Sequence, residues 1–473
     1  MPPLLAASCC SALLAVLGNQ TSFADSSVYN ASLISYFSAQ EAEIHPSCIV
    51  HPAAAADVSS AVLQLTRLDC DFAVRGGGHS VWPGDANIAD GVTIDLRSLN
   101  NVVIHQHNST ISVSGGSVWG DVYRFIEASQ LVIPGGRVGS VGVGGLTTGG
   151  GLSSFSPRFG WTCDNVASME VVLASGAIVQ ADNWQNTDLL EALRGGSNNF
   201  GIVTRFDFQA YPQGNMWGGT VNYDSSTLPQ QLNVLSQLSL AHKYDEFSSI
   251  AMNIVYNADG TLSVQNGLYY TKAVEYPEFL RPLTDIPSTS NTLRIANISN
   301  FADEGTAGSP DGLRDLLATT THGASLDMLK VSFNAWKKNT AAFAGTSLLQ
   351  ARLYLEPYPA AAYTKTAAAN TNVLGLAGDR GTLVVVGIAA AWAESSDDAL
   401  MNQIAENMVA DIDAAAKSLG QHYDWKYLNY ASPWQNVTQS YGAANVKRMR
   451  HVSKKYDPSG VFQKNVPGGF KLA

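Results

Sequence analysis

Hydrophobic and polar positions between residues 52 and 211 alternate between helical and strand periodicity over short distances. The stretch 53–68 (AAAADVSSAVLQLTRL) and the stretch 118–129 repeat apolar residues every three to four positions, which predicts amphipathic helices. Short apolar runs in CIV, FAV, VTIDL, ISVSGG and IVTRFDFQAY predict strands. MEVVLASGAIVQ predicts a hairpin that turns at Ser175 and Gly176. This part of the chain is therefore expected to mix helices and strands in small units.

The pattern changes after Pro212, where long helices alternate with long strands. LSVQNGLYY, LLQARLYLEP and TLVVVGIAAAW predict strands of one sheet, and the stretches 326–343 and 397–420 predict amphipathic helices that pack on it. A helix is expected again in SYGAANVKRMRHVSKKYDP near the C-terminus. No internal repeat or low-complexity linker separates these parts, so we expect one α+β body with two lobes.

The overall composition excludes several classes of protein. Of the 473 residues, 45% are hydrophobic and 14% are charged, which excludes a disordered chain or a long coiled coil. The formal net charge of -11 argues against nucleic acid and anionic membrane surfaces as partners.

The N-terminus has the features of a secretory signal peptide. Residues 4–18 form an apolar run too short to span a bilayer, and TSFA predicts cleavage after Ala24. A buried N-terminal helix is the alternative. Five sequons (Asn19, Asn30, Asn108, Asn297 and Asn436) suit a secreted glycoprotein.

Cysteine usage follows from that processing. Cys9 and Cys10 would be removed with the signal peptide, which leaves Cys48, Cys70 and Cys163. We favour a disulfide between Cys48 and Cys70, because each lies beside a predicted strand of one small unit.

Two glycine-rich loops carry the candidate chemistry. Nine of the seventeen residues from Gly135 to Gly151 are glycine, interleaved with apolar side chains, which is atypical of a mobile linker. A second loop, RGGGHS from Arg75 to Ser80, follows a predicted strand and can surround a pyrophosphate with backbone donors. Neither G-x-G-x-x-G nor the P-loop pattern occurs. The loops thus indicate a dinucleotide held by a fold other than the Rossmann fold.

The motifs RGGGHS, PGGRVGSVGVGGLTTGGG, CDNV, RGGSNNFGIVT and YLNYA…YGAAN…KKYDPSGVFQ together resemble one flavoprotein family. They are similar to the berberine-bridge-enzyme-like branch of the vanillyl-alcohol oxidase/p-cresol methylhydroxylase (PCMH) flavoproteins. The resemblance implies a bilobal α+β fold. A PCMH-type FAD-binding lobe of two α+β subdomains would span 25–211, after a signal peptide at 1–24. A substrate lobe, an antiparallel sheet backed by helices, would span 212–420, and residues 421–473 would return to the FAD lobe.

The resemblance also implies how FAD is held. His79 occupies the position that forms the covalent 8α-histidyl link, although a lone histidine without such a family argument is more often structural. A second, cysteinyl link would require cysteine at Val138, so a single link is expected, and Cys163 is expected to be a buried free thiol. Val141 matches the gatekeeper position at which valine accompanies reaction with O2, which favours an oxidase producing H2O2. The positions expected around the cofactor are Arg75, Gly76, Gly77, Gly78, His79, Ser80, Gly135, Val138, Gly139, Ser140, Val141, Gly144, Gly145, Gly149, Gly150, Asp164, Asn165, Gly201, Val203, Tyr427 and Asn429.

The catalytic base is expected in YLNYA. Several relatives place Glu or Gln where this chain has Gly387, so a carboxylate base is missing there. Tyr427 and Tyr430 are the candidates, and each would need a cationic or hydrogen-bonded neighbour to act at neutral pH. On a strand these two side chains point to opposite sides, so at most one would be catalytic. We favour Tyr427 with Asn429 beside it; the alternative is that both tyrosines only pack.

Other functions fit less well. A serine hydrolase lacks a G-x-S-x-G elbow, and a metalloenzyme lacks clustered ligands. A non-catalytic flavin-binding protein remains open because of Gly387. Among enzymes, a carbohydrate oxidase would use aromatic platforms such as Trp217, Tyr269, Tyr270 and Tyr354, whereas the single flavin link favours oxidation of a secondary metabolite or alcohol. We expect a secreted monomer that binds a small molecule and O2, and neither nucleic acid nor membrane.

Overall fold

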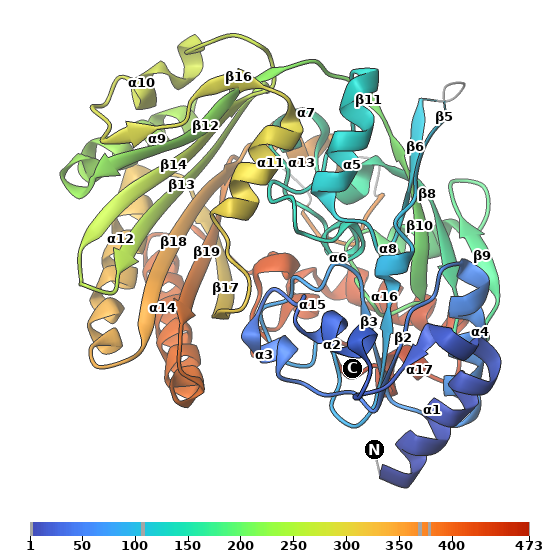
Figure 1. Cartoon of the computed structure of the whole chain (residues 1–473). Coiled ribbons are helices and arrows are strands. Elements are labelled where there is room, and N and C mark those ends of the chain that lie inside the picture. Colours follow the sequence, from blue (N-terminus) through green and yellow to red (C-terminus); the bar gives the residue numbers. More distant parts are fainter. Residues whose placement is uncertain (1–2, 106–108, 368–370, 377–379, 473) are drawn as a thin grey trace.

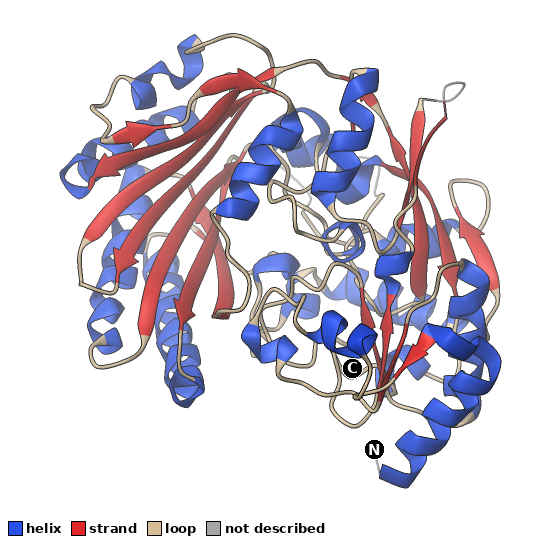
Figure 2. Ribbon diagram, viewed as in Figure 1, coloured by secondary structure: helices blue, strands red, loops and turns tan. Residues whose placement is uncertain are grey.

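The computed structural model describes residues 3–105, 109–367, 371–376 and 380–472, and it divides into two lobes (Figures 1 and 2). Helices and strands alternate through both lobes, which confirms the α+β class. Of the five sequons, Asn108 lies outside the described residues.

A small mixed sheet forms the first unit of the right-hand lobe in Figure 1. Its strand order is β1-β2-β4-β3, with β2, β4 and β3 parallel and β1 antiparallel to β2. The predicted helix at 53–68 is observed as α4, whose buried residues Val58, Ala61, Val62 and Leu65 face this sheet. The elements are α1 (Pro3–Leu17), β1 (Thr21–Ser22), α2 (Ser27–Leu33), α3 (Ala39–Ala42), β2 (Cys48–Val50), α4 (Ala55–Arg67), β3 (Phe72–Arg75) and β4 (Val92–Asp95).

An antiparallel sheet in the order β5-β6-β10-β8-β9 forms the second unit. The predicted hairpin is present, with Gly176 at φ +76° in its turn, a conformation that favours glycine. The elements are β5 (Val102–His105), β6 (Thr110–Ser114), α5 (Trp119–Ile126), β7 (Leu131–Val132), α6 (Val143–Thr148), α7 (Ser156–Phe159), β8 (Val166–Val172), β9 (Ile178–Ala181), α8 (Thr187–Leu193), β10 (Ile202–Gln209) and β11 (Tyr211–Pro212).

A nine-stranded antiparallel sheet forms the left-hand lobe, in the order β15-β12-β14-β13-β18-β19-β17-β20 with β16 also paired to β12. It contains all three strands predicted after Pro212, and α9, α12 and α14 cover one face (Figure 2). Along β18, Leu353 and Leu355 are buried toward these helices, so Arg352, Tyr354 and Glu356 alternate onto the opposite face. The elements are β12 (Met216–Asp224), α9 (Leu228–Ser239), β13 (Ser248–Asn257), β14 (Leu262–Tyr270), α10 (Arg281–Thr284), β15 (Ser290–Asn291), β16 (Arg294–Ala296), α11 (Ile298–Ala307), β17 (Arg314–Gly323), α12 (Leu326–Asn339), β18 (Leu348–Tyr358), α13 (Ala360–Ala367), β19 (Leu383–Trp392), α14 (Asp398–Ser418) and β20 (His422–Tyr423).

The C-terminal segment returns to the right-hand lobe (Figure 1). Its helices are α15 (Val437–Ser440), α16 (Ala443–Tyr456) and α17 (Val461–Lys464). Ion pairs join α16 to α8, between Arg448 and Glu191 at 3.2 Å and between Lys455 and Asp188 at 2.7 Å.

The predicted Cys48–Cys70 disulfide is wrong in this structure. Cys70 is bonded to Cys9 and Cys48 to Cys10, so both partners come from α1. Cys9, Cys10 and Leu13 are buried against α4 and the small sheet, and the segment assigned to the signal peptide is therefore packed as a helix. The sequence prediction failed because it removed Cys9 and Cys10 before pairing the cysteines.

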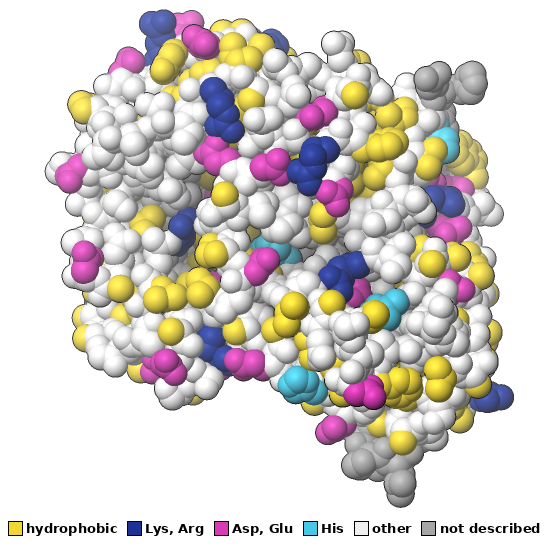
Figure 3. All heavy atoms as spheres, viewed as in Figure 1, with side chains coloured by type: hydrophobic (Ala, Val, Ile, Leu, Met, Phe, Trp, Pro, Cys, Tyr) yellow, Lys and Arg dark blue, Asp and Glu magenta, His cyan; other side chains and the backbone are white. Residues whose placement is uncertain are grey.

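The molecular surface carries charges of both signs. On the face in Figure 3, Lys and Arg side chains are interspersed with Asp and Glu rather than gathered in a basic patch. No helix within the described ranges has the length and hydrophobicity that a membrane span requires.

Candidate active site

A cavity of about 1050 Å³ lies between the two lobes. Both glycine-rich loops, the open face of the nine-stranded sheet and the YLNYA segment line it. The predicted site residues that line it are Gly76, Gly77, Gly78, His79, Ser80, Val138, Val141, Gly144, Gly145, Gly201, Val203, Tyr427, Asn429 and Tyr430. The others are not part of this lining; these are Arg75, Gly135, Gly139, Ser140, Gly149, Gly150, Asp164 and Asn165.

The glycines allow the two loops to meet backbone to backbone. A Cβ on Gly77 would lie 2.6 Å from the Cα of Gly142, so neither position accepts a side chain without moving the other loop. Gly145, in contrast, is exposed and has open space where a Cβ would lie. The contact between the loops thus places bare backbone along the cavity wall, where N–H groups can face a ligand.

His79 lies at the cavity wall in a neutral state. Its ring stacks on Phe37, with ring centroids 3.9 Å apart. Burial lowers the pKa of His79 to about 4. Within the described residues, its buried Nε2 atom makes no hydrogen bond. Backbone contacts hold the loop in place, since the Phe37 N–H donates to the Gly78 carbonyl and Ser38 Oγ donates to the Ser80 carbonyl.

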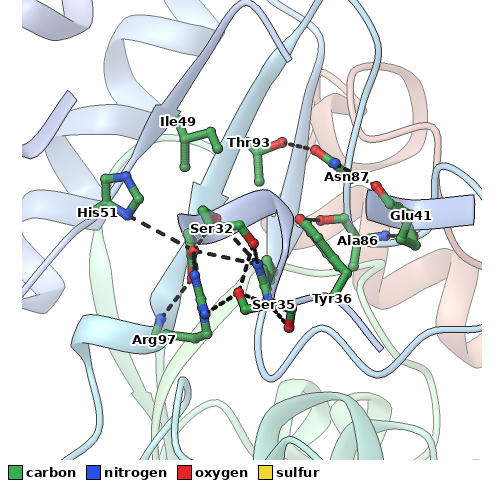
Figure 4. Close-up of polar contacts among 12 residues, drawn as sticks. Ser32, Ser35, Tyr36, Glu41, Ile49, His51, Ala86, Asn87, Thr93 and Arg97 are labelled. Atoms are coloured by element: carbon green, nitrogen blue, oxygen red, sulfur yellow. Dashed lines mark hydrogen bonds and ion pairs between the residues drawn. The ribbon is translucent and has the colours of Figure 1, made fainter. Parts of the chain in front are cut away.

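Arg75 is fully buried and is not part of the cavity lining, and Figure 4 labels three residues that it contacts, Ser32, Ser35 and Tyr36. Its guanidinium donates to the carbonyls of Ser32 and Ser35, both at 2.6 Å, and stacks 3.7 Å from the centre of the Tyr36 ring. Asp95 lies 3.9 Å away. The side chain therefore anchors the segment after α2 beneath the loop instead of contacting a ligand in the cavity.

Arg137, Tyr430 and Glu356 form a charged cluster that the sequence analysis missed. Arg137 Nη2 lies 2.7 Å from the Tyr430 hydroxyl, and 3.1 and 3.0 Å from the two carboxylate oxygens of Glu356. The Tyr430 hydroxyl also donates to Glu356 Oε1 at 3.1 Å. Burial raises the pKa of Tyr430 well above its usual value, and the Arg137 charge opposes that rise. Arg137 is the cationic neighbour that a tyrosine base requires, and the only sequence clue was a charge inside a glycine loop.

The YLNYA segment is a 3₁₀ turn, Leu428–Tyr430, and the predicted strand geometry is wrong. Because of this turn, Tyr427 and Tyr430 face the same cavity, with ring centroids 4.9 Å apart. Tyr427 accepts hydrogen bonds from the Leu152 N–H at 2.7 Å and from Asn429 Nδ2 at 3.1 Å. Burial raises the pKa of Tyr427 to about 12 despite these two donors.

Gly387 provides space for the tyrosines. On β19 it pairs with Tyr354 of β18, and a Cβ there would lie 2.7 Å from Tyr354 and 3.2 Å from Tyr430. Glu356 lies two residues beyond Tyr354, so the site does contain a carboxylate, on the strand next to the expected one. Of the suggested aromatic platforms, Tyr269 and Tyr354 line the cavity, whereas Trp217 is buried in the core and Tyr270 does not reach the lining.

Cys163 is free and buried, and burial raises its pKa well above the usual value. Its neighbours Asp164 and Asn165 have structural contacts. Asp164 accepts from the Trp161 N–H and from Asn372, and Asn165 donates to the carbonyls of Phe159 and Trp161. The CDN motif thus supports the cavity from behind.

The residues present fit a flavin dinucleotide. The cavity is at the upper limit of the ~300–1000 Å³ usual for small-ligand sites. Bare backbone of two glycine loops faces it, and the unpartnered Nε2 of His79 lies at its wall. These features define a two-lobed flavin-dependent oxidoreductase.

Comparisons with known proteins agree with that class. Residues 46–182 match the family described as "FAD binding domain", and residues 426–467 match "Berberine and berberine like". The chain is 35% identical to FAD-dependent monooxygenase drtC of Aspergillus calidoustus over 99% of this chain and 90% of that protein. It therefore belongs to the berberine-bridge-enzyme-like family of FAD-dependent oxidoreductases.

Two further proteins extend the comparison. The chain is 39% identical to Oligopeptidase PhomG' of Diaporthe leptostromiformis over 97% of its own length, but it spans only 37% of that protein. The structure of Physcomitrella patens BBE-like 1 superimposes with a TM-score of 0.81 at 20% identity, covering 98% of this chain and 99% of that one. That structural likeness supports the fold.

Proposed function

We propose that this protein is a secreted oxidase that transfers a hydride from a small organic substrate to FAD held by one covalent bond through His79, and that O2 reoxidises the flavin to give H2O2. The observation that carries the proposal is the unpartnered, neutral His79 Nε2 at the wall of a cavity large enough for the cofactor. A neutral imidazole nitrogen has the free electron pair that a covalent bond requires. Val138 supplies no thiol, and the buried Cys163 does not line the cavity, which supports a single link.

The covalent link is tested by acid precipitation of the purified protein. Flavin is expected to stay in the pellet of the wild type and to move to the supernatant for His79→Ala. Flavin that washes free of the wild type would overturn the link but leave the fold-based class intact. A preparation that never binds flavin would overturn the proposed function.

The bound FAD would supply the hydride acceptor, and the chain's own residues would manage the accompanying proton. In the resting site, Tyr430 donates its hydroxyl proton to Glu356 while Arg137 donates to the phenol oxygen. Transfer of that proton to Glu356 leaves a phenolate that Arg137 stabilises. The Tyr430 oxygen is then able to take a proton from an O–H or N–H of the substrate. For this reason we assign the base to Tyr430, and we give Tyr427 and Asn429 a positioning role.

A monooxygenase is the second candidate, because the relative drtC is named as one. The two reactions differ in the fate of oxygen. An oxidase releases H2O2 in proportion to oxidised product, whereas a monooxygenase places one atom of O2 in the product. Turnover under 18O2 with peroxide quantification distinguishes them, and Val141 at the cavity wall supports the oxidase.

A secondary metabolite or alcohol is favoured over a carbohydrate, because two of the four suggested aromatic platforms do not line the cavity. The two disulfides support an oxidising compartment, and they require that α1, which carries Cys9 and Cys10, stays attached.

A further inference from the structure

The open face of the nine-stranded sheet carries a row of polar side chains that the proton chemistry leaves unused. Asn222, Gln265 and Asn253 lie opposite one another on β12, β14 and β13, and Tyr354 of β18 continues the row. Arg352 lies two residues before Tyr354 on β18. All of these side chains line the cavity, and this group is called the amide subsite below.

Arg352 is a half-buried cation whose hydrogen-bond partners are neutral. Its Nε donates to Gln350 Oε1 at 2.6 Å, and its Nη1 donates to Gln265 Oε1 at 3.2 Å. Within the described part of the chain, no carboxylate forms an ion pair with it. Burial raises the pKa of the adjacent Tyr354, so that phenol is also uncharged.

Glu356 and Asp315, two carboxylates that line the same cavity, do not pair with Arg352. Glu356 pairs with Arg137. Asp315, across the sheet on β17, has its pKa raised to about 7 by burial alone, so Arg352 does not stabilise its charge. A partly desolvated guanidinium without a counter-ion is costly, and its fork matches a carboxylate or another ionised oxygen.

The amide subsite also offers a ligand a hydrogen-bond acceptor and free space. Asn253 Oδ1 is buried without a hydrogen-bond partner among the described residues, so a ligand hydroxyl can donate to it. Small residues of β13, β14 and β19 also line the cavity on this face and leave space there; these are Ala251, Gly267, Ala389 and Ala391.

The strand fixes the separation of the subsite from the proposed reacting centre. Glu356 lies four residue steps after Arg352 on β18, about 13 Å away at ~3.3 Å per step. A substrate that contacts both ends must be elongated, with its acidic group remote from the oxidised carbon.

We propose that the substrate of this protein is an elongated, hydroxylated organic acid, whose carboxylate or other ionised oxygen binds Arg352 in the amide subsite. This inference deepens the proposed function and rests on it for the reaction at the other end of the cavity.

The experiment compares an acid with its neutral counterpart on the purified holoprotein. Dissociation constants for anthracene-2-carboxylate and anthracene-2-carboxamide are measured by isothermal titration calorimetry, with benzoate as a short acid. The three-ring carboxylate is expected to bind about tenfold or more tightly than the carboxamide, and benzoate is expected to bind weakly. Arg352→Gln should bring the acid-to-amide ratio close to one. Lys330→Gln removes an exposed positive charge on α12 and should keep the ratio.

A wild-type ratio near one, or a preference retained in Arg352→Gln, would overturn the proposal. If circular dichroism shows that Arg352→Gln does not fold, Arg352→Lys replaces it. This variant keeps the charge without the guanidinium fork and is expected to prefer the acid over the amide less strongly than the wild type does. The acid-to-amide ratio of the wild type still tests the proposal. Flavin content is read from the absorbance of the same sample. A flavin-loaded protein without acid preference refutes the subsite alone, whereas a protein that never binds flavin refutes the proposed function.

Discussion

Arg137 donates a 2.7 Å hydrogen bond to the hydroxyl of Tyr430, joining the glycine-rich loop of one lobe to the C-terminal segment. Glu356, from the sheet of the other lobe, accepts from both side chains. A phenol placed between a guanidinium and a carboxylate has a stabiliser for its anion and an acceptor for its proton. The Arg137 charge lowers the pKa of Tyr430 against the rise that burial and the Glu356 charge cause, so the proposed base depends on this cation.

Tyr430→Phe is expected to slow anaerobic flavin reduction by about a hundredfold or more, the usual scale of general-base catalysis. Arg137→Gln should shift the ascending, low-pH limb of the kcat/KM profile to higher pH, because loss of the cation raises the pKa of the phenol that must be deprotonated. Stopped-flow absorbance of the flavin measures both effects. Tyr427→Phe is the matched control and should have the smaller effect; a larger loss in Tyr427→Phe would transfer the role of base to Tyr427.

Gly387→Ala tests whether the space beside the tyrosines matters. The new methyl group would lie 2.7 Å from the Tyr354 ring and 3.2 Å from Tyr430, so Tyr430 must shift relative to Arg137. We expect flavin reduction to slow by about tenfold, since misplacement of a catalytic group by ~1 Å costs up to a hundredfold. Flavin content should stay unchanged. Gly214→Ala, at an exposed position with open space around it, is the control, and equal rates in the two variants would contradict this role for Gly387.

Much of the fold could be predicted because the spacing of apolar residues that marks a helix or a strand is a local property of the sequence. The strands at 262–270, 348–357 and 382–392 and the helices at 326–343 and 397–420 all appear where apolar spacing placed them. The strand order of the nine-stranded sheet was not predictable in this way, because it depends on contacts between distant segments. The strand prediction for the YLNYA segment was wrong for a related reason, because five residues are too few to distinguish a strand from a 3₁₀ turn.

The candidate site was predictable only in part. The glycine clusters and His79 can be recognised from the sequence alone, since their residue types are unusual for a linker or a core. The cluster of Arg137, Tyr430 and Glu356 is not, because its members come from three distant segments and each has an ordinary structural role on its own. Arg75 shows the opposite case: its position in the RGGGHS loop suggested a ligand contact, but its long side chain donates to the carbonyls of Ser32 and Ser35 instead.

Asp315 predicts a pH-dependent stability. Burial raises its pKa from 3.8 to about 7, so the folded state holds its proton more tightly than the unfolded state. The stability from this group is complete below about pH 4 and is lost as the pH rises to about 7. Asp315→Asn should therefore match the wild type near pH 4 and exceed it at pH 8, by about 2–4 kcal/mol in the free energy of unfolding.

Urea unfolding at several pH values measures this difference. Asp285→Asn, at an exposed carboxylate, is the control and should change stability equally at both pH values. A wild type that is as stable as Asp315→Asn at pH 8 would show that Asp315 is ionised without cost in the folded protein.

The two disulfides from α1 are expected to contribute strongly to the stability of the small sheet. They close loops with sequence separations of 61 and 38 residues, and loops of this size restrict the unfolded chain by about 4 kcal/mol each. Replacing both Cys9 and Cys10 by serine should lower the midpoint of urea unfolding, because α1 is then held by non-covalent contacts with α4 and the small sheet. Cys163→Ala removes the free thiol and is the control for the loss of a cysteine.

Peptide mapping under non-reducing conditions tests the pairing itself. Digestion is expected to give linked peptides containing Cys9 with Cys70 and Cys10 with Cys48, and N-terminal sequencing should find α1 still attached. A mature protein that begins at Asp25 would instead confirm cleavage after Ala24. In that case neither disulfide exists, Cys48 and Cys70 become each other's nearest candidates, and the small sheet must be stable without α1.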